Sequence, residues 1–174
     1  MEGFLNPNKI LKQLKLQKGM QVADFGCGSG GWTIPLAKIL KDEKIYAFDI
    51  QEEMLSALRS RAKLENIQSI ETRRCDLETP KATRLEDNSL DFVLVPNLLF
   101  QVENKKAIIE EAKRILKKGG RILVLDWTPG AHLGPKESRV SEKEVKKLAK
   151  EFDLKLEKEF QAGIYHYGLI FEKP

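Results

Sequence analysis

The chain has 174 residues, of which 41% are hydrophobic and 32% charged, a composition that fits one globular domain and excludes wholesale disorder. The formal net charge of +4 and the pI near 9.0 permit a nucleic-acid partner without requiring one. No stretch approaches the roughly 18 apolar residues of a membrane span. Two cysteines are too few for a disulfide framework or a cysteine-rich metal site. We therefore expect a cytoplasmic protein with no membrane span and no metal; composition leaves the oligomeric state open.

Apolar runs and helix-like segments alternate along the chain. Strands are expected at 21–25, 45–49, 70–74, 90–95 and 121–126, and helices at 9–14, 32–40, 52–65, 104–116 and 141–151. This alternation predicts an α/β protein with a doubly wound parallel sheet covered by helices on both faces. The end of the chain differs, because 154–160 and 165–171 flank Gln161-Ala162-Gly163 and predict an antiparallel hairpin. Ser141 and Glu144 have the spacing of a helix capping box.

A glycine-rich stretch, residues 24–31, lies between the first strand and the second helix. Gly26 permits a tight turn, and Gly28 lets the backbone approach a ligand where a side chain would block it. The amides at the start of the following helix then face that ligand. Gly26, Gly28 and Gly31 also fit the G-x-G-x-x-G dinucleotide fingerprint, so the loop predicts a nucleotide site without identifying the nucleotide.

Asp49 ends the second predicted strand, ~20 residues beyond the glycines, where an acid is placed to hydrogen-bond a ribose diol. The same side chain could cap the helix that begins near Glu52, and both roles can hold together. We favour the ribose role because of the glycine loop upstream.

Residues 22–33 resemble motif I of the class I S-adenosylmethionine-dependent methyltransferases, whose pattern is hydrophobic, acidic, any, then G-x-G-x-G. The resemblance covers nearly the whole chain: the ribose-acid segment at 46–50, the adenine segment at 74–77, motif IV at 91–100, and at 114–125 the helix, glycine turn and fifth strand, with Lys118 where Pro is usual. The most similar subgroup contains small-molecule methyltransferases of the ubiquinone/menaquinone type. The resemblance implies a Rossmann-like sheet of seven strands, mostly parallel with a C-terminal antiparallel hairpin, and S-adenosyl-L-methionine as cofactor.

The resemblance also implies where the cofactor is bound. Asp24 would lie near its ammonium group, Asp49 would hold the ribose hydroxyls, Ile50 would pack on the adenine, and Asp76 would accept from the adenine amine. Alternatively Asp76 caps a turn, and Asn97 only orders its loop. The full set expected at the cofactor is Asp24, Gly26, Cys27, Gly28, Gly30, Asp49, Ile50, Met54, Asp76, Leu77, Asn97 and Leu98.

A nicotinamide-dependent oxidoreductase is the main enzyme alternative. Asp24, two residues before Gly26, fits the methyltransferase pattern, whereas dehydrogenases usually have an apolar residue there. The terminal hairpin is also foreign to the simple dinucleotide fold. Both features favour the methyltransferase.

Motif IV restricts the acceptor. Val95-Pro96-Asn97-Leu98 is not the Asp/Asn-Pro-Pro-aromatic signature for planar exocyclic amines, and the chain has no Pro-Cys dipeptide for cytosine C5 chemistry. Arsenite methylation would require more thiols. Oxygen, nitrogen, sulfur and activated-carbon acceptors remain. We favour a small molecule, with an RNA or protein acceptor at an open site, or a catalytically silent cofactor-binding module, as alternatives.

Catalytic residues are harder to predict. The candidates are Asp126, at the end of the fifth strand where it could face the acceptor, His132, in the loop bordering the open face, and His166, inside the last hairpin. His is the usual base near neutral pH. The alternatives are strand-end packing for Asp126 and a surface or structural role, which we favour, for each histidine. Arg139 would recognise an anionic acceptor or face solvent. We expect a single domain, 1–174, with a core at 20–174 and an N-terminal helical lid segment at 1–19.

One basic cluster stands out from the mixed charge of the rest. It comprises Arg59, Arg61, Lys63, Arg73 and Arg74. Scattered surface charge is the favoured interpretation, and a nucleic-acid groove is the alternative.

Overall fold

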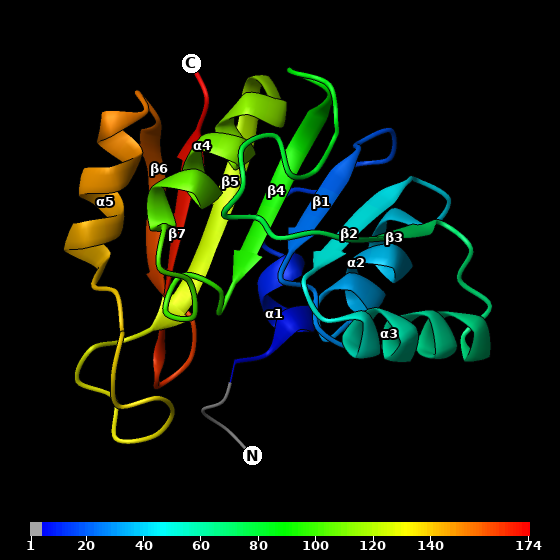
Figure 1. Ribbon diagram of the computed structural model, residues 1–174, viewed down its shortest axis with the longest axis horizontal. Coiled ribbons are helices and arrows are strands. Elements are labelled where there is room, and N and C mark those ends of the chain that lie inside the picture. Colours follow the sequence, from blue (N-terminus) through cyan, green and yellow to red (C-terminus); the bar gives the residue numbers. More distant parts are fainter. Residues whose placement is uncertain (1–4) are drawn as a thin grey trace.

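The computed structural model describes residues 5–174 and contains a seven-stranded sheet in the order β3-β2-β1-β4-β5-β7-β6 (Figure 1). The strands are β1 (Val22–Phe25), β2 (Ile45–Asp49), β3 (Ile70–Arg74), β4 (Leu90–Pro96), β5 (Leu116–Trp127), β6 (Lys155–Gln161) and β7 (His166–Glu172). Strands β1 to β5 run parallel, whereas β7 pairs antiparallel with both β5 and β6. The predicted mostly parallel sheet with a C-terminal antiparallel hairpin is confirmed.

Helices cover both faces of the sheet. They are α1 (Pro7–Leu11), α2 (Thr33–Leu40), α3 (Glu52–Leu64), α4 (Lys105–Ile115) and α5 (Glu142–Glu151). Figure 1 shows α4 in front of the sheet and α2 behind it. Buried side chains of α4 and α5 join one hydrophobic cluster, and those of α1 and α2 join another. The sheet is therefore doubly wound, as expected.

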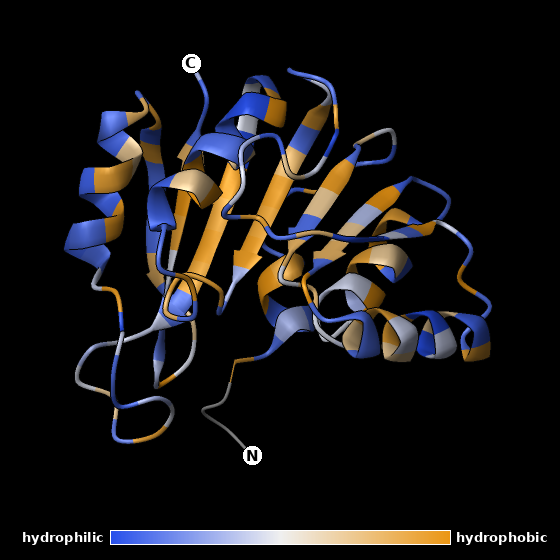
Figure 2. Ribbon diagram, in the orientation of Figure 1, coloured by the Kyte–Doolittle hydropathy of each residue, from blue (hydrophilic) through white to orange (hydrophobic). Residues whose placement is uncertain are grey.

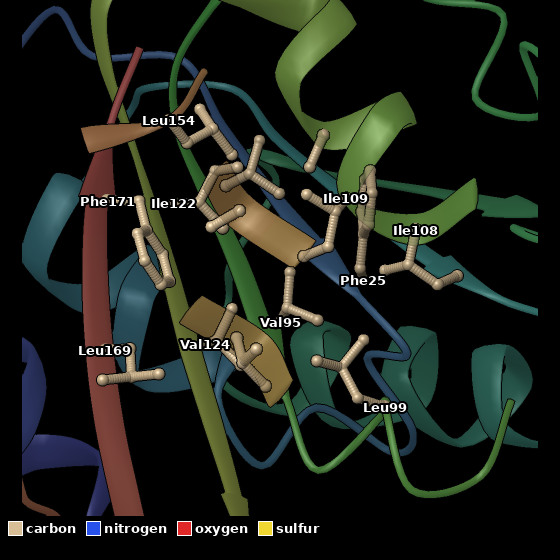
Figure 3. Close-up of a cluster of buried hydrophobic side chains, with 14 of the residues drawn as sticks. Phe25, Val95, Leu99, Ile108, Ile109, Ile122, Val124, Leu154, Leu169 and Phe171 are labelled. Carbon is tan, nitrogen blue, oxygen red and sulfur yellow. The ribbon is translucent and has the colours of Figure 1, made fainter. Parts of the chain in front are cut away.

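The two clusters arise from the alternation of side chains along each strand. In β5, Ile122 and Val124 belong to the cluster under α4, while Leu123 and Leu125 belong to the cluster on the opposite face. Figure 2 shows the central strands as the hydrophobic part of the molecule and the outer surfaces of the helices as hydrophilic. Figure 3 shows the α4 cluster, where Ile109 approaches Val95 and side chains of β5.

Most boundaries agree with the sequence prediction to within one residue, and the larger differences are at α1 and at the start of β5. Helix α1 ends at Leu11 rather than Leu14. Helix α1 begins at Pro7 rather than Lys9, because the Asn6 side chain accepts a hydrogen bond from the Lys9 amide and Pro7 is suited to the first helical position. Strand β5 begins at Leu116 rather than Arg121, because Leu116 already pairs with Leu90 before the register shifts.

All five parallel strands end at one edge of the sheet. In Figure 1 the arrowheads of β4 and β5 point to this edge, and the long loop after β5 extends beyond it. The segments that follow the strands carry most of the residues singled out in the sequence. In open α/β sheets this edge is where ligands bind.

In residues 5–174, no helix has both the length and the apolar character needed to cross a bilayer. The first part of the predicted lid, residues 1–4, lies outside the described residues. The remainder of that segment includes α1, whose Ile10 and Leu11 are buried against the sheet side that carries α2.

Candidate functional site

The glycine loop after β1 is tied to the neighbouring strand β2. The amides of Gly26 and Cys27 both donate to the Phe48 carbonyl oxygen at 2.9 Å. Gly26, Gly28 and Gly30 have φ angles of 70°, 52° and 89°, in the left-handed region that favours glycine. The loop therefore needs glycine at these positions for its backbone conformation, in addition to the space that the missing Cβ atoms leave.

Asp49, at the end of β2, is 9% exposed and holds this loop in place. Its Oδ2 accepts from the Gly28 amide at 2.8 Å, and its Oδ1 accepts from the Gln51 amide at 2.9 Å, at the start of α3. The helix-start contact considered from the sequence is therefore present. A carboxylate oxygen can accept further hydrogen bonds, so Asp49 keeps acceptor capacity for a ligand.

Asp24, in β1, is fully buried. Its Oδ2 accepts from the Thr33 hydroxyl at 2.6 Å, but within residues 5–174 its Oδ1 has no hydrogen-bond partner. Burial raises the pKa of Asp24 to about 7; the hydrogen bond from Thr33 opposes this rise and the charge of Asp49 adds to it. An unpartnered buried acceptor is costly, so this oxygen is suited to a donor supplied by a ligand.

A cleft of about 450 Å³ lies beside the glycine loop. Eight of the twelve residues predicted at the cofactor line it: Gly26, Gly28, Asp49, Ile50, Met54, Asp76, Leu77 and Leu98. Cys75, Gln51, Glu78, Gln101 and Val102 complete the wall. The last four were missed, although each lies within four residues of a predicted one, because their residue types carry no motif of their own.

The other four predicted residues, Asp24, Cys27, Gly30 and Asn97, lie outside the lining. Cys27 is 5% exposed, and burial raises the pKa of its thiol. The Asn97 amide donates to the Leu125 carbonyl at 2.7 Å, which orders the segment after β4. The buried Asn97 Oδ1 has no partner in the described part of the chain, so a second acceptor is left unmatched beside β1.

Asp76 does cap a turn, because its Oδ1 accepts from the Glu78 amide at 2.9 Å. It also lines the cleft, so capping and a ligand contact are compatible. Further along the same segment after β3, the buried Thr83 is held by Glu111 of α4. Glu111 Oε1 accepts hydrogen bonds from both the backbone amide and the hydroxyl of Thr83. This side of the cleft is therefore anchored to α4.

Asp126, at the end of β5, is fully buried, and the main chain occupies its carboxylate. Its oxygens accept from the amides of Trp127 at 2.7 Å and Phe100 at 3.3 Å. Burial raises the pKa of Asp126 to about 6, and these amide hydrogen bonds oppose the rise. Asp126 thus orders the segment after β4, whose Leu98 and Gln101 line the cleft. A catalytic role for it stays a prediction.

The two histidines lie in different environments. His132 is exposed on the loop after β5. His166 is 3% exposed, lies against the Trp127 ring at 4.1 Å between centroids, and has no hydrogen-bond partner for either nitrogen among the described residues. Burial lowers the pKa of His166 to about 4, so the ring is neutral at pH 7 and a weak base. Catalysis by either histidine stays a prediction.

Arg139 is half-buried rather than simply facing solvent, and recognition of an anionic acceptor by it stays a prediction. Its guanidinium donates to five carbonyl oxygens of its own loop: Thr128, Pro129, Ala131, Leu133 and Pro135. Gly134 of the same loop packs on Trp127, since a Cβ there would lie 2.4 Å from the ring. Arg139 therefore shapes the 128–139 loop, and the sequence signal, a lone Arg after a Pro/Gly-rich stretch, was too weak to predict this.

Comparison with known proteins agrees with this geometry. Residues 16–166 match a family model described as a methyltransferase domain. A SAM-dependent methyltransferase from Aquifex aeolicus superposes with a TM-score of 0.86 at 26% identity, covering 96% of this chain and 89% of that one. The chain belongs to the class I S-adenosylmethionine-dependent methyltransferases, whose cofactor is S-adenosylmethionine.

Among curated proteins, the chain is similar to demethylmenaquinone methyltransferases. The protein from Staphylococcus aureus is 30% identical over 120 residues, 68% of this chain and 47% of that protein. The protein from Geobacillus stearothermophilus is 31% identical over 67% of this chain and 49% of that protein. The chain thus spans about half the length of these relatives. The fold is also shared with the [4+2]-cyclase SpnF, with a TM-score of 0.82 at 14% identity, covering 97% of this chain and 79% of that one.

Proposed function

We propose that this protein transfers the methyl group of S-adenosylmethionine to a small-molecule acceptor. The observation that carries the proposal is the cleft beside the glycine loop, where Asp49 offers acceptor capacity and the neighbouring Asp24 keeps a buried, unpartnered oxygen. Family membership adds the cofactor class. A Cβ on Gly28 would meet no protein atom within 4 Å, so the backbone leaves room for a ligand.

The residues fit the cofactor group by group. Asp49 accepts from the ribose hydroxyls while keeping its bond to the Gly28 amide. The exposed side chains of Ile50 and Met54 cover an apolar ring face, and Asp76 accepts from an exocyclic amine at its edge. Asp24 and Asn97 each present an unpartnered oxygen to an ammonium group. When bound, S-adenosylmethionine supplies an electrophilic methyl group on a sulfonium.

The protein's contribution is then mainly positioning, because methyl transfer is an in-line displacement. Leu98 lines the cleft beside Gly26, and Asp126 fixes the segment that carries Leu98 through the Phe100 amide. The acceptor enters from the side of the 128–139 loop. Since the curated relatives are named demethylmenaquinone methyltransferases, a demethylmenaquinone-type quinol is the first acceptor to assay.

The test begins with calorimetric titration of the purified protein with S-adenosylmethionine, S-adenosylhomocysteine and NAD. We expect saturable binding of the two adenosyl ligands and none of NAD. Asp49→Ala should weaken adenosyl binding by roughly tenfold or more, because it removes hydrogen bonds to a charged group. Asp42→Ala, which changes an exposed acid on the turn before β2, is the matched control and should bind normally.

Turnover is then followed as transfer of a labelled methyl group to a panel of quinols, small phenols, RNA and protein. Transfer to a small molecule supports the proposal. Transfer to RNA or protein alone, or tight cofactor binding without any turnover, would replace it with an open-site enzyme or a silent binding module. Binding of NAD alone would revive the dehydrogenase.

A further inference from the structure

A second depression, of about 440 Å³, adjoins the cofactor cleft at the end of β3. Residues 73–76 and 79–84 line it, and Cys75 and Asp76 form part of both cavities. Four of its lining side chains are cationic and one is acidic: Arg73, Arg74, Lys81 and Arg84 against Asp76. We call it the basic depression. Of its lining residues, the proposed methyl transfer gives a role to Asp76 alone.

Of these four cations, only Arg73 forms an ion pair within residues 5–174, although Lys81 lies near enough to Asp87 to lower its pKa. Arg73 is paired with Glu71 at 2.6 Å, but Arg74 donates only through Nε, to the Ile50 carbonyl at 3.0 Å. Neither Lys81 nor Arg84 forms an ion pair with any described residue. Burial raises the pKa of the Cys75 thiol to about 11. The charges of Glu111 and Asp76 add to this rise, and those of Arg73 and Arg84 oppose it, so the two cations lie near this wall together with two acids.

The backbone presents these cations at a conformational cost. Lys81 and Arg84 have φ angles of 55° and 53°, in the left-handed region where a residue with a Cβ is disfavoured by roughly 1 kcal/mol. Glycine or asparagine would be the less strained choice at both positions. Between them, Thr83 is fixed by the buried Glu111, and its carbonyl accepts from Arg73 at 3.0 Å. The backbone of the rim is thus held at Thr83, with the exposed Lys81 and Arg84 on either side of it.

We propose that the basic depression binds a phosphate group, carried either by free phosphate or by a phosphate monoester. A dianionic phosphate offers several acceptor oxygens to the free donors of Arg74, Lys81 and Arg84, and charge-assisted hydrogen bonds of this kind are strong. Only part of the basic cluster noted in the sequence lies at this depression. Arg59 pairs with Glu52 and Arg61 donates to the Ser29 carbonyl, whereas Arg73 and Arg74 line the depression.

The test is a titration of the ¹⁵N-labelled, cofactor-free protein with inorganic phosphate and, separately, with ribose 5-phosphate. Saturable shifts of amides within residues 73–84 are expected. The double variant Lys81→Gln/Arg84→Gln should weaken binding by roughly tenfold or more, since it removes two charged donors. Lys41→Gln is the matched control, because Lys41 is an exposed lysine with a φ of 60° outside the depression, and its affinity should be unchanged.

Tighter binding of ribose 5-phosphate than of phosphate would indicate a monoester as the ligand, and equal binding would show that recognition stops at the phosphate group. Absence of saturable shifts would overturn the proposal. So would equal weakening by Lys41→Gln, since that result would indicate non-specific attraction. Because the titration contains no cofactor and no methyl acceptor, its result is independent of the proposed transfer activity.

Discussion

Gly28 and Gly30 lack a side chain for different reasons. A Cβ on Gly28 would meet no protein atom within 4 Å, whereas a Cβ on Gly30 would lie 2.4 Å from Leu58 Cδ1. Gly28 therefore leaves room for the ligand, and Gly30 lets α3 pack closely against the glycine loop. Both were assigned to the cofactor from the motif, but only Gly28 lines the cleft.

We expect Gly28→Ala to abolish measurable cofactor binding while the protein remains folded. We expect Gly30→Ala to lower the free energy of unfolding by more than Gly28→Ala does. In the first variant the added methyl group occupies ligand space, whereas in the second it forces Leu58 away, a form of overpacking that costs about 1–3 kcal/mol. Gly119→Ala is the control for left-handed strain alone, because Gly119 has a φ of 76° and open space around it. Urea unfolding and calorimetry separate the two effects; equal stability losses for Gly28→Ala and Gly30→Ala would contradict this account.

Asp24 should make the stability of the ligand-free protein depend on pH. Its folded pKa of about 7 lies above the ordinary value of 3.8, so its contribution to stability is present below about pH 4 and lost as pH rises through about 7. Asp24→Asn should therefore become more stable relative to wild type by roughly 2–3 kcal/mol between about pH 5 and about pH 8. Urea unfolding at the two pH values measures this difference, and a constant difference would argue against the raised pKa.

Cofactor binding should also release a proton near neutral pH, because an ammonium group favours the ionised form of Asp24. Calorimetry in buffers of different ionisation enthalpy measures the released fraction. It should be substantial below about pH 7 and absent in Asp24→Asn. Proton release that persists unchanged in the variant would assign it to another group.

The 128–139 loop behaves as one unit because Arg139 joins five of its carbonyl oxygens. Trp127 continues the strand into it, and the Thr128 amide donates to the Tyr165 carbonyl of the C-terminal hairpin at 2.8 Å. The loop thus has a defined shape, with Leu133 47% exposed.

We expect Arg139→Lys to loosen this loop while the sheet remains intact, because an ammonium group has three donors and cannot match the planar guanidinium. Amide hydrogen exchange within residues 129–138 should accelerate by roughly tenfold or more, consistent with the loss of hydrogen bonds to a charged donor. Lys136→Ala, which changes an exposed neighbour, is the control. If exchange in the loop were unchanged, the five contacts would not determine its order.

Across the whole molecule, Glu111 and Arg114 connect α4 to the loop after β3. Glu111 is 4% exposed and accepts from Arg114 and Thr83, and Arg114 also pairs with Asp87 at 2.5 Å. Burial would raise the pKa of Glu111, but the hydrogen bonds from Arg114 and Thr83 outweigh it and lower the pKa.

Glu111→Gln should lower the free energy of unfolding by about 3 kcal/mol at neutral pH, because Arg114 is left without its buried partner. The contribution of Glu111 is present above its unfolded pKa and lost as pH falls through the lower folded value. The difference from wild type should therefore shrink in acid. Urea unfolding across this range measures it, with the exposed Glu110→Gln as control; a difference independent of pH would sink the charge explanation.

Local patterns were sufficient to predict the strands and helices. Apolar runs bounded by turn residues located β1, β2, β4 and β5, and the turn at Gln161-Ala162-Gly163 located β6 and β7. The Ser141–Glu144 spacing located the start of α5, where the capping box forms. Missed boundaries depended on contacts between distant segments. Strand β5 begins at Leu116 because its backbone pairs with Leu90, and no property of Leu116 itself indicates that pairing.

The sequence by itself determined the family and the sheet, and it predicted most of the residues that line the cleft beside the glycine loop. It could do so because glycines and strand-end acids act through the backbone near them, and a linear motif records such local roles. Only the tertiary structure decided which side chains share a cavity. In the folded protein Gly30 packs against Leu58, and Arg139 donates hydrogen bonds to carbonyl oxygens of its own loop. Lys81 and Arg84 line the same depression as Arg74. These outcomes depend on packing and on hydrogen-bond partners contributed by other segments, and the linear order of residues does not encode them locally.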